Sequence, residues 1–143
     1  RMAALLHELA DWRVRHGRDE PAEACWRKVL ELPPGQMDAL ATAKAHAGLA
    51  DLAWRHYRHN DALAHAQETL ARLPGEPATE TEAALRLEAL ALRAKVFAYR
   101  KRWSDALRET ERARAVLQRW PELFDALRSE LAFQAATALD ATQ

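Results

Sequence analysis

The densest group of potential metal ligands in the sequence consists of His56, His59, His65 and Asp61. His56 and His59 are three residues apart, which would place both imidazoles on one face of a helix, and imidazole is a common zinc ligand. A new helix is expected to begin at Asn60, however, so His65 would lie on the second turn of a different element. Neighbouring arginines also disfavour a cation. We therefore predict that these side chains are solvated and bind no metal.

Sequence motifs that position a nucleophile or a phosphate are absent: there is no G-x-S-x-G, Walker loop, G-x-G-x-x-G, H-E-x-x-H or C-x-x-C. The single cysteine, Cys25, stands between Ala24 and Trp26 in an apolar stripe, which predicts a buried thiol and excludes an intramolecular disulfide. His7 and His46 have no obvious catalytic carboxylate partner and are interpreted as structural. We predict no enzymatic activity and no cofactor.

The charges balance, with 21 Lys and Arg against 21 Asp and Glu, so no global field attracts a polyanion. The most basic stretch, residues 100–119, also carries acids that can pair with its arginines three residues away, Asp105 with Arg108 and Glu109 with Arg112. A nucleic-acid surface needs a face without acids. We predict a solvated helix in this stretch and no nucleic-acid partner.

The composition indicates helices. The 143 residues include 32 Ala and 21 Leu but only four Val, seven Thr and no Ile, and β-branched residues are what strands favour. No run of 18 apolar residues occurs, so no membrane insertion is expected. The first 15 residues show an amphipathic pattern rather than that of a signal peptide. We expect a segment of a longer protein, in the cytoplasm or the periplasm; the sequence does not distinguish the two.

Glycines and prolines divide the chain into seven expected helices. Gly17 is a natural residue directly after a helix, because it adopts positive φ without strain. Gly48 stands inside a helix, where glycine costs about 1 kcal/mol relative to alanine, so it is expected to mark a close helix crossing. The expected helices cover residues 2–16, 19–32, 37–58, 60–73, 79–99, 104–119 and 122–139.

Polar residues before several of these helices are predicted to cap them, since their side chains can accept a hydrogen bond from the first-turn N–H groups. The predicted caps are Asp19, Asn60 and Ser104. The fifth helix is expected to start near Thr79 or Thr81.

Short turns predict antiparallel helix pairs, and these pairs repeat. Ala22, Ala62 and Ala106 fall at equivalent places in the second helix of each pair, 40 and 44 residues apart. The first helices carry small residues at their own equivalent places, namely Ala10, Ala50 and Ala94. Small residues at these places allow the paired helices to approach closely.

The first pair reads Leu6-x2-Leu9-Ala10, Gly17, Ala22-x3-Trp26, Val29 and Pro34. This resembles the tetratricopeptide pattern W-x2-L-G-x2-Y, A-x3-F and P, with Leu6 in place of Trp and Arg13 in place of Tyr. The resemblance extends over residues 5–119. The repeats are longer than the usual tetratricopeptide repeat, as in regulatory and sensor domains of bacteria, and Arg93 stands where the family has Leu.

The resemblance implies an all-α fold: a single domain of antiparallel helix pairs stacked as a right-handed superhelix with a concave face. The units would be residues 2–34, 37–74 and 78–119, followed by a capping helix at 122–139. Trp26 and Phe97 are expected to fill gaps between pairs, with Trp54 the partly open tryptophan. A closed bundle of three or four helices is the structural alternative.

In the family, the first helix of each pair lines the concave groove. The residues that the resemblance places there are His7, Asp11, Arg15, Lys44, Asp51, Trp54, Arg55, Glu88, Lys95 and Tyr99. One version of this groove clamps a carboxylate with lysines and asparagines, but here Asp11 and Asp51 occupy the asparagine places and would repel such a ligand. A solvated face of mixed charge is the alternative interpretation.

The resulting functional prediction is a scaffold without catalytic activity that binds a peptide or protein partner on the concave face. The alternative is a ligand-sensing regulatory domain of a bacterial signalling or transcription protein. A third hypothesis is a homodimer formed through an unpaired terminal helix. The first pair also resembles repeats of bacterial exopolysaccharide export proteins over about 30 residues, where Leu-Ala-x-Trp-Arg precedes Gly-Arg-Asp.

Overall fold

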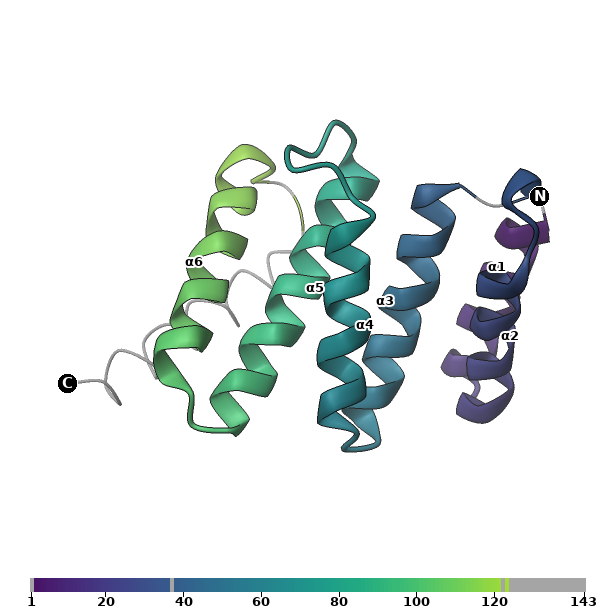
Figure 1. Cartoon of the computed structure of the whole chain (residues 1–143), viewed down its shortest axis with the longest axis horizontal. Coiled ribbons are helices and arrows are strands. Elements are labelled where there is room, and N and C mark those ends of the chain that lie inside the picture. Colours follow the sequence, from purple (N-terminus) through teal and green to yellow (C-terminus); the bar gives the residue numbers. More distant parts are fainter. Residues whose placement is uncertain (1, 37, 122, 124–143) are drawn as a thin grey trace. The chain divides into compact units, whose positions relative to one another are not determined.

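The computed structural model describes residues 2–36, 38–121 and 123 (Figure 1). These residues form six α-helices and one short 3-10 turn and contain no strand, which confirms the all-α prediction. The helices are α1 (Met2–Arg15), α2 (Asp19–Glu31), α3 (Ala39–Arg55), α4 (His59–Ala71), α5 (Glu80–Tyr99) and α6 (Trp103–Arg119), and the 3-10 turn is Pro34–Gln36. The predicted seventh helix, residues 122–139, lies outside the described residues apart from Leu123.

The chain divides into two compact units, Arg1–Leu73 and Pro74–Gln143. The first unit contains two hairpins: α1 packs against α2, α3 packs against α4, and α3 also contacts both helices of the first hairpin. The second unit contains the hairpin of α5 and α6. Pairing of consecutive helices is therefore confirmed. The stacking of all pairs in one superhelical domain stays a prediction.

The three hairpins make the same turn. Three residues separate the helices of each pair, and the middle one has a left-handed backbone. These residues are Gly17 (φ 72°), Tyr57 (φ 62°) and Lys101 (φ 61°). The N–H of the next residue, an arginine each time, bonds back to a carbonyl five residues earlier, at 2.7 Å in the first hairpin and 2.8 Å in the other two. This is the Schellman arrangement that closes a helix C-terminus. The turn therefore recurs at the spacings of 40 and 44 residues found in the sequence.

This turn explains why three predicted caps are wrong. The N-cap positions are held by Arg18, Arg58 and Arg102, and none of their side chains makes a capping hydrogen bond. Because each helix begins two residues after the left-handed one, with only the arginine between them, Asp19, Asn60 and Ser104 fall inside the first turn instead. For the fifth helix, Thr79 rather than Thr81 is the cap, and with Glu82 it forms a reciprocal capping box.

Replacing Tyr57 by glycine is expected to raise the free energy of unfolding by about 0.5–1 kcal/mol. A left-handed backbone costs an L-residue roughly 1–2 kcal/mol, which glycine avoids at a partial cost in chain entropy. The side chain is 78% exposed, so little packing is lost. Urea denaturation measures the change, and Gly17→Ala should shift stability in the opposite direction. A Tyr57→Gly protein less stable than its parent would contradict the argument.

The small residues predicted to lie at close contacts between paired helices are buried. All six alanines are buried: Ala10, Ala22, Ala50, Ala62, Ala94 and Ala106. The predicted close crossing at Gly48 is also confirmed, because a Cβ placed there would lie 2.3 Å from Cε2 of Trp26. Trp26 is buried in α2 and packs over Gly48 in α3. The indole therefore joins the first hairpin to the second.

Two arginines noted in the sequence comparison with the tetratricopeptide pattern have polar partners within their hairpins. Arg13, which stands in the place of a tyrosine, donates hydrogen bonds to the carbonyl oxygen of Pro21 and to Sγ of Cys25, each at 3.1 Å. Cys25 itself is buried, as predicted. Arg93, which stands in the place of a leucine, lies 3.3 Å from the carboxylate of Glu109. Each arginine thus joins the two helices of its hairpin by hydrogen bonds.

Glu109 corrects the prediction of a wholly solvated sixth helix. The predicted pairs Asp105–Arg108 and Glu109–Arg112 both form, at 2.9 and 3.3 Å. Glu109, however, is only 2% exposed. Its carboxylate lies between Arg93 and Arg112, so α6 carries a buried, doubly paired acid on the side that faces α5.

Candidate protein-binding surface

The predicted groove residues fall into equivalent rows on the first helix of each hairpin. Asp11, Asp51 and Lys95 form one row, and Arg15, Arg55 and Tyr99 form the next, each spaced by 40 and 44 residues. Lys44 and Glu88 are likewise 44 residues apart. The residues on α1 and α3 belong to the first unit, whereas Glu88, Lys95 and Tyr99 belong to the second. Of this last group, Glu88 and Tyr99 are exposed and Lys95 is half-buried.

On α1, both ring nitrogens of His7 have polar partners. The indole N–H of Trp26 donates to Nδ1 of His7 at 3.1 Å, and Nε2 of His7 lies 3.4 Å from the carboxylate of Asp11. Burial lowers the pKa of His7, Asp11 opposes that shift, and the nearby cation of Lys44 adds to it. A neutral imidazole suits this place, because Nδ1 must accept the indole proton. The exposed Asp11 and the half-buried Lys44 thus border one polar area on the adjacent helices α1 and α3.

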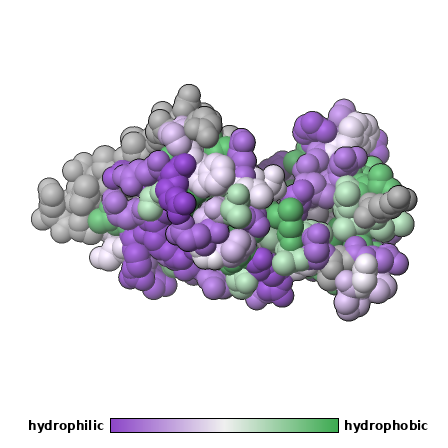
Figure 2. Space-filling model, turned by 90° about the horizontal axis from the view of Figure 1, so that it is seen from above, coloured by the Kyte–Doolittle hydropathy of each residue, from purple (hydrophilic) through white to green (hydrophobic). Residues whose placement is uncertain are grey.

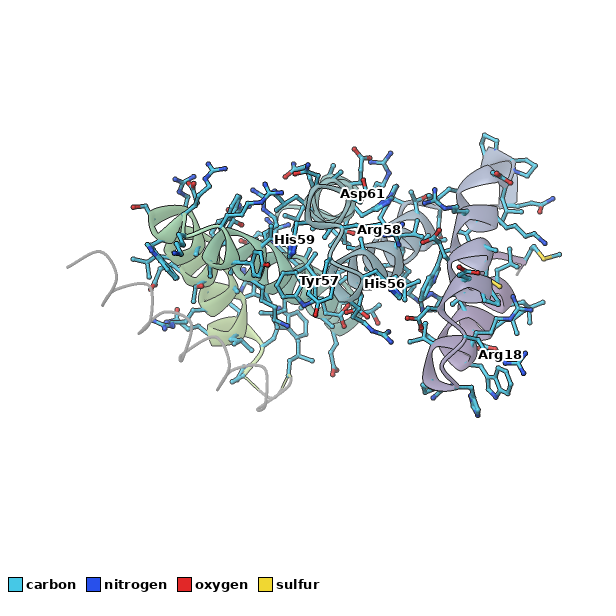
Figure 3. The ribbon with its side chains drawn as sticks, turned by 90° about the horizontal axis from the view of Figure 1, so that it is seen from below. Arg18, His56, Tyr57, Arg58, His59 and Asp61 are labelled. Atoms are coloured by element: carbon cyan, nitrogen blue, oxygen red, sulfur yellow. The ribbon has the colours of Figure 1, made fainter. Side chains whose placement is uncertain are left out.

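On α3, Arg55 is held between two acids. Its guanidinium lies 3.7 Å from Asp51 and 3.3 Å from Asp19, which is at the start of α2. Asp19 also contacts Nε2 of His56 at 2.9 Å. Figure 3 shows His56, Tyr57 and Arg58 around the second hairpin turn and Arg18 at the first. Asp51 stays exposed on the face, while Arg55 connects it to the neighbouring hairpin.

A second ion pair links the turn between α3 and α4 to α2. Arg58 donates to Glu23 of α2 at 2.9 Å, and this hydrogen bond is the main reason that the pKa of Glu23 lies below its ordinary value. Sequence patterns did not predict that Asp19 and Glu23 pair with Arg55, His56 and Arg58. These pairs are separated by 35–37 residues in the sequence, slightly less than the repeat spacing of 40, and this separation is what could have indicated them.

The tryptophans differ from expectation in one respect. Trp54 is partly exposed, as predicted, but its ring stands edge-on to His59 of α4, with centroids 5.1 Å apart. Trp12 is the more open residue at 45% exposure, and His16 stacks on its ring at a centroid distance of 4.0 Å. Trp54 therefore belongs to the packing of its own hairpin as well as to its surface.

The histidines singled out as potential metal ligands have separate partners. His56 contacts Asp19, His59 lies beside Trp54, and His65 shares a hydrogen bond with His46, with 3.0 Å between the two Nδ1 atoms. Within residues 2–36, 38–121 and 123, no three His, Cys, Asp or Glu side chains are grouped so as to hold a metal ion.

The His46–His65 pair predicts a pH dependence of stability. Burial, followed by repulsion from His65 and Arg72, lowers the pKa of His46 to about 4, while Glu68 opposes the shift. The pKa of His65 is also lowered, chiefly by burial. The unfolded chain binds these protons first as the pH falls, since its histidines titrate near 6.5. The free energy of unfolding should therefore decrease as the pH falls from about 6.5 toward about 4.

Denaturant titrations at several pH values check this expectation. A His46→Gln variant should lose less stability over that interval than the parent, because one of the titrating groups has been removed. Equal slopes for the variant and the parent would show that His46 does not contribute to the pH dependence.

Comparisons with protein-family models, curated proteins and solved structures give no match. Among the described residues, no helix has both the length and the apolar character required to span a membrane. The described part of the chain is all-helical and consists of hairpins that share one turn, with exposed acids on the first helix of each pair and exposed arginines on α1 and α3.

Proposed function

We propose that this chain is a non-catalytic, tetratricopeptide-like scaffold that binds a protein or peptide partner. The binding face of the first unit consists of the polar side chains on α1 and α3, and Glu88, Lys95 and Tyr99 are the corresponding residues on α5 of the second unit. The observation that carries the proposal is the recurrence of one turn and one row of surface positions in three hairpins. Repeated units of this kind provide extended surfaces suited to a polypeptide ligand.

Contacts within the first unit support the proposal. Trp26 and Gly48 join the first two hairpins closely, and the ion pairs of Asp19 and Glu23 hold the second turn against α2. The candidate binding residues of the first unit therefore lie on packed helices, α1 and α3, and not on loops. A pre-organised face loses little conformational entropy on binding.

Two exposed acids on this face of mixed charge offer contacts for a basic ligand side chain. Asp11 and Asp51 are both exposed, and each sits one turn from a basic partner on its own helix, His7 and Arg55 respectively. A ligand segment with Lys or Arg could replace these intramolecular pairs, and the exposed ring of Tyr99 offers the second unit a contact for an apolar residue. The expected ligand is thus a peptide segment that combines a basic and an apolar side chain.

Selection of random peptides on the intact chain tests this proposal. Enriched peptides should contain Lys or Arg next to an apolar residue, and Asp51→Lys should weaken their binding about tenfold, less so at high salt. Glu31→Lys is the matched control, because Glu31 is an exposed acid on α2. Peptides that respond to Glu31→Lys and ignore Asp51→Lys would place the binding surface elsewhere.

A further inference from the structure

One side of α1 exposes large apolar residues. Met2, Leu5, Leu9 and Trp12 are 49%, 62%, 40% and 45% exposed, and they recur at the three- and four-residue intervals that align side chains along one helix face. We refer to these four residues as the α1 stripe. Figure 2 shows hydrophobic side chains on the surface of the part formed by α1 and α2. The core-facing residues of α1, such as Ala3 and Ala10, lie on a different side of the helix.

The same face is buried in the next repeat. Forty residues after the α1 stripe, α3 carries Thr42, Ala45, Leu49 and Leu52. All four are at most 8% exposed, and the last three belong to the apolar cluster that α3 forms with α1 and α2. In this fold, therefore, the face occupied by the α1 stripe is one that packs against another helix. The interface between α3 and the first hairpin shows the packing that such a face forms when it is covered.

The spacing of the α1 stripe is self-complementary. Its intervals of three, four and three residues read the same in both directions, so an antiparallel second α1 places Leu5 opposite Leu9 and Met2 opposite Trp12. Two-fold pairing of this kind needs no surface other than the stripe itself. The chain is also formally neutral, with 21 basic and 21 acidic residues, so no net charge opposes the approach of two copies.

We propose that the α1 stripe is a homodimer interface, in which two copies of this chain associate through antiparallel α1 helices. The proposal is independent of the peptide-binding face, because Asp11 lies on another side of α1. A stripe of four side chains is smaller than a standard interface, so the dimer should be weak, with a Kd on the order of tens of micromolar.

Sedimentation equilibrium of the intact chain between about 5 and 500 μM tests the dimer, since this range brackets the expected Kd. The average mass should rise from the 16.2 kDa of the monomer toward twice that value. Leu5→Glu should weaken association at least about thirtyfold, because it would bury a charge at the interface. Ala4→Glu adds the same charge at an exposed position of α1 outside the stripe and should leave the dimer unchanged.

Leu5 is largely exposed in the monomer, so circular dichroism should show the Leu5→Glu protein folded. A monomeric mass throughout the concentration range would overturn the proposal. So would a dimer that Leu5→Glu does not affect, since that dimer would form through another surface.

Cross-linking tests the antiparallel order in a Cys25→Ala background, which removes the only native thiol. A Leu5→Cys protein mixed with a Leu9→Cys protein should form a disulfide under mild oxidation several times faster than either protein alone. Identical positions are offset by about 6 Å along the antiparallel helices, whereas residues 5 and 9 face each other. Equal rates for the mixture and for each protein alone would contradict this order.

Discussion

Replacing Glu109 by alanine is expected to lower the free energy of unfolding by about 3 kcal/mol, because it removes a buried carboxylate that pairs with two arginines. The carboxylate is 2% exposed and accepts hydrogen bonds from Arg93 and Arg112. Arg112 can turn toward solvent after the substitution. Arg93 is mostly buried and lies over the ring of Phe97, so it would lose its contact with the carboxylate at a place with little access to water.

Glu111→Ala is the matched control for this experiment. Glu111 lies on the same helix and pairs with Arg114 at 3.3 Å, but both side chains are exposed, so its loss should cost no more than about 0.5 kcal/mol. Chemical denaturation of the three proteins gives the comparison. Joint replacement of Arg93 and Glu109 by leucine should recover most of the lost stability, because an apolar pair carries no desolvation cost. Equal losses for the Glu109 and Glu111 variants would show that burial of Glu109 has no energetic effect.

Replacing Gly48 by alanine should destabilise the first unit by about 2 kcal/mol. Alanine is the better helix former by about 1 kcal/mol, so on helix propensity alone the change would stabilise the protein. The added methyl group would, however, meet the buried indole of Trp26 at 2.3 Å. Helix and ring must then separate, and overpacking of this kind typically costs 1–3 kcal/mol or more. The sign of the change, measured by urea denaturation, distinguishes the two effects.

Gly35→Ala provides the comparison, because a Cβ there meets no atom within 4 Å. Its stability should stay close to that of the parent. In a double-mutant cycle, Gly48→Ala combined with Trp26→Leu should cost at least about 1 kcal/mol less than the sum of the two single changes, since the smaller side chain leaves room for the methyl group. Additive costs would show that the indole is not what opposes the alanine.

Local features of the fold were predictable because their causes lie within a few residues. Gly17 predicted a left-handed turn, and Gly48 predicted a close crossing; both are observed. The caps Asp19, Asn60 and Ser104 were predicted wrongly because the Schellman turn closes one helix and starts the next within three residues, which places an arginine at each N-cap and these three residues in the first turn.

Contacts between helices were less predictable. The pairing of Glu109 with Arg112 follows from helical spacing, but its burial depends on Arg93 of a different helix. Likewise, the partners of Asp19 and Glu23 lie 35–37 residues away, at the next hairpin turn. Within the candidate surface, the sequence placed Asp11 and Asp51 on exposed faces but could not show that His7 is bound to Trp26.

The contact between Trp26 and Gly48 also has an evolutionary consequence. Neither position can vary alone, because a larger residue at 48 collides with the indole, whereas a smaller residue at 26 leaves a cavity. Related sequences should therefore change the two positions together, with side chains larger than glycine at 48 accompanied by aliphatic residues at 26. A lineage that crosses from one combination to the other would pass through a destabilised intermediate, which makes this pair a slowly changing marker of shared descent.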